Sequence, residues 1–225
     1  MIKALYKSLG EQVFSILRKK IVDNELSPGT VLQIDRLAEE FSVSTTPIRE
    51  ALMKLEALGL VTISPNRRAT VSPISRTQTR EVLEFRRMLE SAGCRSAAVK
   101  LPDSDIDYLM ARVQSVMENP LDVALHIEVD MELHDKYLFG CIENSFVRKA
   151  LEDLQVHLRR IRFYAEEALD PAKVIADVGR EHTAILEALK ARDEDRAERA
   201  MHAHLTQTLI RTLESMDRKE HSPRS

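Results

Sequence analysis

Apolar residues near the start of the chain recur at helical spacing and then, further on, in short runs typical of strands. Val13, Leu17 and Ile21 repeat every four residues, which predicts an amphipathic helix over residues 5–25. Pro28-Gly29 then interrupts the pattern, because this dipeptide favours a turn. The residues that follow predict a short strand at 31–33, helices at 34–41 and 45–58, and strands at 60–64 and 69–73.

The two short helices and the strand pair after them have the order of a winged helix-turn-helix. Ser42-Val43-Ser44 is expected to form the tight corner between the helices. Pro47 falls in the first turn of the second helix, where a missing N–H costs nothing, and Gly59 is expected to end that helix. Residues 65–68 join the two strands and place arginines at the tip of the ribbon.

From Ser75 onward the pattern is helical throughout. Pro, Gly, Asn and Asp residues divide it into six segments at roughly 75–100, 103–118, 122–140, 144–168, 171–191 and 193–217. Short connections predict an antiparallel bundle. The expected fold class is therefore mainly α, with an N-terminal winged helix-turn-helix (α+β) followed by an all-α antiparallel helical bundle. The predicted domains are 1–74 and 75–217, with a disordered tail at 218–225.

The second helix of a helix-turn-helix lies in the major groove, with its N-terminal residues facing the base edges. Arg49 can donate two hydrogen bonds to guanine or bind a phosphate. Basic residues in the wing can contact the DNA backbone without reading sequence. A generic α+β module would share this shape. The candidate DNA-binding residues are Ser44, Thr45, Thr46, Arg49, Arg67 and Arg68.

Charge and composition add modest constraints. The formal net charge is −3, but residues 1–75 carry ten Lys and Arg against eight Asp and Glu, which leaves the rest of the chain at −5. This asymmetry agrees with nucleic-acid binding at one end only. The two isolated cysteines, the absence of a secretory signal and the lack of any long apolar stretch predict a cytoplasmic protein without a membrane partner. The chain has six glycines and no catalytic motif that we recognise, so it is not expected to be an enzyme.

The helical part contains residues suited to metal binding. Asp130 and His134 lie four residues apart on one helix, and His182 and His204 lie on two later helices. Three imidazoles and one carboxylate would suit a divalent Zn, Ni, Mn or Fe ion with open positions for a ligand. Isolated histidines in helical bundles are more often satisfied polar residues. Spacing alone leaves both interpretations open.

Two sequence runs resemble the GntR family of regulators. Leu26-Ser27-Pro28-Gly29-Thr30-Val31-Leu32 and the run from Val43 to Leu52 (VSTTPIREAL) are similar to the start of its DNA-binding domain and to its recognition helix. Thr45 departs from the arginine that usually begins that helix. Asn66 and Arg68 replace two glycines of the usual wing. The resemblance implies DNA binding, and the departures imply an operator that differs from the usual one.

Residues 78–215 resemble the FCD effector domain of the FadR-like GntR branch. The resemblance implies metal ligation by Asp130, His134, His182 and His204. It also implies effector binding by Arg86, through a carboxylate, and by Asn144. On the residues alone, Arg86 could instead pair with Glu90 on a wet helix face, and Asn144 could be a helix N-cap.

The expected function is that of a ligand-responsive DNA-binding transcriptional regulator, acting as a repressor. We expect a homodimer on a palindromic double-stranded operator, because one winged helix reads few base pairs. The effector is expected to be a small carboxylate-containing compound, whether a sugar acid, hydroxy acid, dicarboxylate or amino-acid-like acid. The alternatives are a metal-dependent hydrolase built on a helical bundle and a regulator that senses the metal itself.

Overall fold

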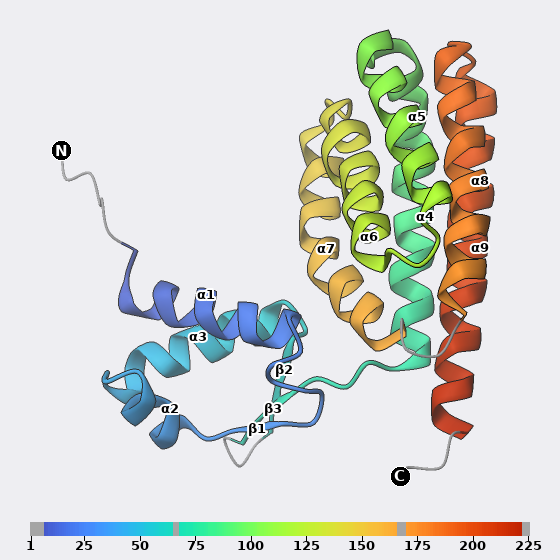
Figure 1. Cartoon of the computed structure of the whole chain (residues 1–225). Helices are drawn as coiled ribbons and strands as arrows, with labels where there is room; N and C mark the ends of the chain where they lie inside the picture. Colours follow the sequence, from blue (N-terminus) through green and yellow to red (C-terminus); the bar gives the residue numbers. More distant parts are fainter. Residues whose placement is uncertain (1–6, 65–67, 166–169, 222–225) are drawn as a thin grey trace, which may run out of the picture. The chain divides into compact units, whose positions relative to one another are not determined.

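The computed structural model describes residues 7–64, 68–165 and 170–221. The chain divides into two compact units, Met1–Ser75 with Arg159–Phe163, and Arg76–Leu158 with Tyr164–Ser225. The mainly helical fold class, with a small sheet in the N-terminal part, is confirmed. Figure 1 shows the elements in sequence colours.

The N-terminal unit has the helix and strand order that the sequence predicts. Ser8 and Glu11 form a capping box at the start of α1, which satisfies two backbone N–H groups there. The sheet is antiparallel with strand order β1-β3-β2, so β3 pairs with both other strands. The elements are α1 (Leu9–Val22), β1 (Val31–Leu32), α2 (Ile34–Glu40), α3 (Thr45–Ala57), β2 (Val61–Ile63) and β3 (Ala69–Val71).

One apolar core fixes α3 within this unit. Ile48, Leu52 and Leu55 point inward from α3 and are almost fully buried, as is Leu17 of α1. The exposed face of α3 is consequently the face opposite these residues. Gly59 ends the helical segment with a φ of 67°, a backbone conformation that side chains rarely adopt.

The C-terminal unit is a bundle of long helices. They are α4 (Arg76–Lys100), α5 (Asp103–Glu118), α6 (Val123–Met131), the π-helix η1 (Glu132–Leu138), α7 (Ser145–Ala165, of which Arg159–Phe163 group with the other unit), α8 (Pro171–Lys190) and α9 (Glu194–His221). The predicted helix at 122–140 is thus an α-helix followed by a π-helix. A π-helix closes its hydrogen bonds over one more residue per turn, which changes where its side chains point.

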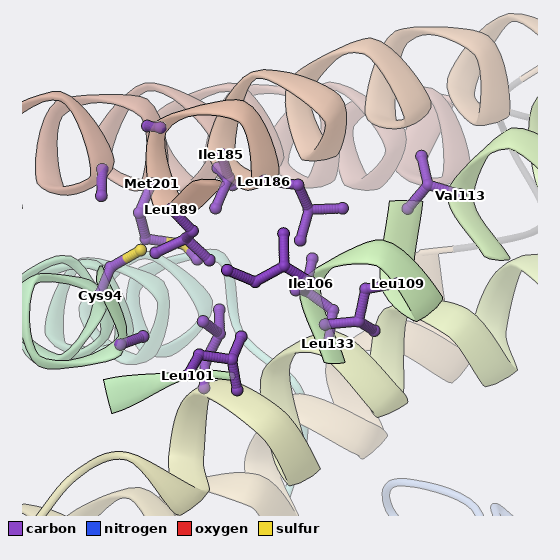
Figure 2. Close-up of a cluster of buried hydrophobic side chains, with 14 of the residues drawn as sticks. Cys94, Leu101, Ile106, Leu109, Val113, Leu133, Ile185, Leu186, Leu189 and Met201 are labelled. Atoms are coloured by element: carbon purple, nitrogen blue, oxygen red, sulfur yellow. The ribbon is translucent and has the colours of Figure 1, made fainter. Parts of the chain in front are cut away.

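The bundle core lies between α4, α5, η1, α8 and α9. Figure 2 shows Ile106 and Leu109 of α5 meeting Leu133 of η1 and the aliphatic side chains of α8. Arg87 and Arg95 of α4 bond Thr206 and Glu198 of α9 at 3.1 and 2.9 Å, so these two helices run antiparallel. Among the described residues, no helix is long and apolar enough to cross a membrane.

Candidate metal centre and DNA-reading surface

The start of α3 presents the residues predicted to read DNA. Ser44, Thr46 and Arg49 are exposed, and Thr45 is half-buried. The Ser44 side chain makes no capping hydrogen bond, which leaves its hydroxyl available to a ligand. Arg68 is exposed immediately before β3, whereas Arg67 lies outside the described residues. The start of α3 therefore offers three hydroxyl side chains and one guanidinium group to a nucleic acid, and the buried residues of the same helix fix it to the core of the unit.

Four side chains of the C-terminal unit meet inside the bundle. Asp130 comes from α6, His134 from η1, His182 from α8 and His204 from α9. Each offers one ligand atom, and these four atoms all lie within 4.8 Å of one another. The three imidazoles are buried.

The distances within this cluster suit atoms that share one ion. Nε2 of His134 and Nε2 of His182 are 3.4 Å apart. Oδ1 of Asp130 lies 3.7 Å from the first nitrogen and 3.6 Å from the second. Ligands bonded to one metal at about 2.0–2.2 Å stand roughly 3 to 4 Å from each other, so only small shifts would be needed. The donor set therefore fits a divalent ion.

Two carboxylates lie within hydrogen-bond distance of the Nδ1 atoms of His134 and His204, on the side of each ring away from Nε2. Glu90 Oε2 lies 2.7 Å from Nδ1 of His134, and Glu181 Oε2 lies 2.8 Å from Nδ1 of His204. A carboxylate at Nδ1 favours the tautomer that carries its hydrogen there, which frees Nε2 to bind a metal. Both carboxylates are themselves bonded to arginines. Arg86 Nε donates to Glu90 at 2.6 Å, and Arg211 donates two hydrogen bonds to Glu181.

Burial favours the neutral form of two of the imidazoles, those of His182 and His204. Burial lowers the pKa of His204 and, helped by the neighbouring His204 and His134, lowers the pKa of His182 well below its usual value. These imidazoles are neutral at neutral pH, as metal ligands must be.

The supporting carboxylates behave in the opposite way. Burial alone would raise the pKa of Glu90, but Arg86 and His134 outweigh it and bring the pKa to about 2. Burial likewise opposes ionisation of Glu181, but hydrogen bonds from Arg211 and His204 bring its pKa to about 2. Both carboxylates are therefore ionised at neutral pH.

The two predicted effector contacts have local partners. Arg86 does pair with Glu90, but the pair is buried rather than on a wet face. Of the Arg86 nitrogens, only Nε donates a hydrogen bond to Glu90, and the two terminal nitrogens donate to none of the described residues. Asn144 is exposed, and its Oδ1 accepts from the backbone N–H groups of Phe146 and Val147 at 3.0 and 3.3 Å, which caps α7. The role of both residues in effector binding stays a prediction.

A pocket lies against His134. Its outline encloses about 360 Å³, a volume that includes open solvent, and the space left between its side chains is about that of one water molecule. Asp135 lines it beside His134, and burial raises the pKa of this carboxyl. The other lining residues are Glu90, Gly93, Leu138, Phe139, Ile142, Leu151, Gln155 and Leu158.

Three residues of this region were not singled out from the sequence, namely Asp135, Gln155 and Glu181. Glu181 directly precedes a predicted ligand and Asp135 directly follows one, so adjacency was an available signal. Glu90 was noticed only as a partner of Arg86. Gln155 of α7 carries no signal of its own in the sequence.

Comparison with known proteins identifies the family of both parts of the chain. Residues 81–207 match the profile of the FCD domain, and residues 9–71 match that of the bacterial regulatory proteins, gntR family. The transcriptional repressor RspR of Escherichia coli K12 is 31% identical over 88% of this chain and 86% of its own length. The repressor NanR of Cronobacter sakazakii is 29% identical over 96% of this chain and 89% of its own length.

The fold also occurs in solved structures. McbR/YncC of E. coli superposes with a TM-score of 0.70 at 24% identity, covering 94% of this chain and 100% of that chain. A GntR regulator from Rhodococcus sp. RHA1 gives a TM-score of 0.70 at 20% identity, covering 92% and 99%. At these identities the likeness concerns the fold alone.

Proposed function

The chain belongs to the GntR family and carries an FCD domain, and from that premise we propose that it is a repressor controlled by a small organic acid bound beside a divalent metal ion. As a family member it is a DNA-binding transcriptional regulator. The observation that carries the proposal is the convergence of Asp130, His134, His182 and His204 beside a pocket. The relatives are regulators rather than enzymes, which leaves the hydrolase alternative without support.

In this proposal Asp130, His134, His182 and His204 hold the ion, which can be Zn, Ni, Mn or Fe. A bound divalent ion would supply the positive charge that draws a carboxylate into an otherwise apolar bundle. Arg86 supports the same ligand chemistry, because its terminal nitrogens make no hydrogen bond to the described residues and can form two parallel hydrogen bonds with a carboxylate. Asn144 is the second predicted effector contact.

At the other end of the chain, Ser44, Thr45, Thr46 and Arg49 are proposed to face base edges, with Arg67 and Arg68 at the DNA backbone. The exposure of Ser44, Thr46, Arg49 and Arg68 supports this assignment. The protein is proposed to bind a palindromic operator as a homodimer, because two half-sites are needed for useful affinity and specificity.

Coupling between the two ends is proposed to run through helix packing. The metal ligands come from α6, η1, α8 and α9, so filling the site changes how these elements pack. Glu90 connects this cluster to α4, which follows the DNA-binding unit directly in sequence. An effector shifts operator affinity only if it binds the DNA-competent and DNA-incompetent states unequally.

The test uses the full-length protein and an operator selected from random DNA. Operator affinity is measured with and without metal, and with and without a panel of organic acids. The proposal expects an acid to weaken operator binding only in the metal-loaded protein. If metal alone changes operator affinity and no acid adds to it, the protein senses the metal instead. An acid response of equal size in the metal-free protein would overturn the proposed role of the ion.

A further inference from the structure

The exposed side of α3 carries several long side chains that contact the rest of the N-terminal unit. Glu50 lies against Gly10 of α1, so closely that a side chain at position 10 would collide with its carboxylate. Lys54 lies 3.8 Å from Glu11 of the same helix α1. Glu56 accepts a hydrogen bond from a backbone N–H group of β2 at 3.0 Å. These three side chains are therefore engaged within the unit.

Three other exposed side chains of α3 form a line that the unit leaves free. Thr46, Arg49 and Met53 are three and four residues apart, so they follow one another along one side of the helix. All three are exposed, and Met53 has 66% of its surface accessible. Among the described residues, none of the three has a hydrogen-bond or ion-pair partner. This line is consequently the part of α3 that is available to DNA.

Met53 is the apolar member of this line. Single exposed apolar residues are common on protein surfaces and need no ligand to explain them. Met53, however, stands one helical turn beyond Arg49, on the face that is proposed to enter the major groove. An apolar side chain on that face must contact some group of the DNA when the helix is bound, and the chemistry of the groove limits which group this is.

The major groove of B-DNA presents one apolar group, the C5-methyl group of thymine. The other groups exposed there are hydrogen-bond donors and acceptors on the base edges. Met53 donates no hydrogen bond, and its thioether sulfur is only a weak acceptor. Contact with a thymine methyl group is therefore the interaction by which this side chain can distinguish one base pair from another. Its three rotatable bonds let it adapt to the position of that methyl group.

Helix geometry indicates where this thymine lies in the operator. Met53 is four residues beyond Arg49, which corresponds to about 6 Å along the helix axis. Successive base pairs of B-DNA are about 3.4 Å apart. When the helix follows the groove, the thymine therefore lies about two base pairs from the base or phosphate that Arg49 contacts.

We propose that Met53 is a specificity-determining residue that reads one thymine in each operator half-site through the C5-methyl group. The inference rests on the proposed function, since it assumes that α3 is the reading helix. It adds an apolar contact to the polar contacts proposed for the start of α3. It also specifies the sequence of the half-site at one position, where thymine is selected over the other three bases.

The test removes a single methyl group from the operator. Uracil pairs as thymine does and lacks only the C5-methyl group, so each thymine of the selected operator is replaced by uracil, at the same position in both half-sites. Operator affinity is measured for the full-length unchanged chain, for Met53→Ala, for Met53→Leu and for Lys54→Ala. Alanine and leucine are strong helix formers, so these exposed substitutions preserve α3. Lys54→Ala changes the adjacent exposed residue, which faces Glu11, and is the matched control.

For the unchanged chain, uracil at one position should weaken binding about fourfold per half-site, the size expected when one methyl group is lost from an apolar contact. Met53→Ala should bind the thymine and uracil operators equally at that position. Met53→Leu and Lys54→Ala should keep the preference for thymine. A half-site without thymine, tolerance of uracil at every position, or an undiminished preference for thymine in Met53→Ala would each overturn the inference.

Thr46 offers a competing source of the same contact, because its side chain also carries a methyl group. Thr46→Ser removes that methyl group and keeps the hydroxyl. Loss of the preference for thymine in Thr46→Ser, with the full preference retained in Met53→Ala, would assign the contact to Thr46 and overturn the role of Met53.

Arg49→Ala separates this inference from the proposed function. If Arg49→Ala loses specific binding while the unchanged chain tolerates uracil at every position, α3 remains the reading helix and the role of Met53 is wrong. If Arg49→Ala and Met53→Ala both bind the operator normally, the assignment of α3 as the reading helix fails as well.

Discussion

Glu90 Oε2 lies 2.7 Å from Nδ1 of His134, so a carboxylate on α4 sets the orientation of an imidazole on η1. Glu181 does the same for His204 at 2.8 Å. Each carboxylate is neutralised by an arginine of its own, Arg86 or Arg211. His134 and His204 are therefore pre-oriented by two ion pairs, one buried and one partly buried, rather than by packing alone.

Replacing Glu90 with glutamine should weaken metal binding by about 10- to 100-fold, because the neutral amide no longer fixes the His134 tautomer and ring orientation. Competition against a chelator of known affinity measures the change. Glu81→Gln, an exposed acid on the same helix, is the control and should bind metal normally. Unchanged affinity in Glu90→Gln would mean that His134 is oriented by its surroundings without this bond.

The double substitution His134→Ala with His204→Ala should abolish both metal binding and the effector response while operator binding persists, because the recognition helix belongs to a separate compact unit. Metal analysis and operator titration measure the two effects. His202→Ala, an exposed histidine on the same helix as His204, should change neither. A full effector response in the metal-free double variant would show that the cluster is structural.

The metal-free protein should lose stability as the pH falls, in two ranges. His182 and His204 have pKa values below 6.5 in the native state, so below pH 6.5 the unfolded state binds protons that the native state does not, and the free energy of unfolding decreases. Glu90 and Glu181 have pKa values of about 2 against 4.5 in the unfolded state. Their contribution is complete above pH 4.5 and is lost as the pH falls towards 2.

Urea denaturation of the chelator-treated protein at a series of pH values measures both ranges. The combined variant Glu90→Gln with Glu181→Gln should be less stable at neutral pH and should lose most of the decline in the lower range. A profile for this variant parallel to that of the unchanged protein would rule out these two carboxylates as the cause.

Arg49 and Arg68 should have different roles in DNA binding. Arg49→Ala should reduce specific operator binding by roughly 1–3 kcal/mol for a lost bidentate contact. Arg68→Ala should weaken binding to all sequences and lower the salt-dependence slope by about one unit. Operator and random DNA titrated at several salt concentrations distinguish the two. Lys54→Ala, in the last turn of α3, is the control. Normal operator binding by Arg49→Ala would show that α3 is misassigned as the reading helix.

The protein should be a homodimer both free and on its operator, because a single winged helix contacts too few base pairs for specific binding. Sedimentation of the protein alone and with operator DNA measures the stoichiometry. A single protein copy per operator would contradict the palindromic arrangement.

The sequence by itself determined the order of the elements, because their signals are local. The turn at Pro28-Gly29, the stop at Gly59 and the proline in the first turn of α3 act within a few residues of the backbone they shape. Each predicted strand ran one or two residues past its actual C-terminal end, and the one for β2 also began one residue early, since pairing between strands and not composition decides where a strand ends. The recognition run and the candidate ligands were likewise found from residue identity and family resemblance.

Tertiary structure decided which distant residues meet. No sequence signal placed Asp130 and His134 at the passage from α6 into a π-helix, because the apolar pattern there is equally compatible with one continuous α-helix. The pairing of Glu90 with His134 joins residues 44 positions apart and depends on how α4 and η1 pack around the bundle core. The same packing brings Asp135 of η1 and Gln155 of α7 to one pocket, an arrangement that spacing along the chain does not specify.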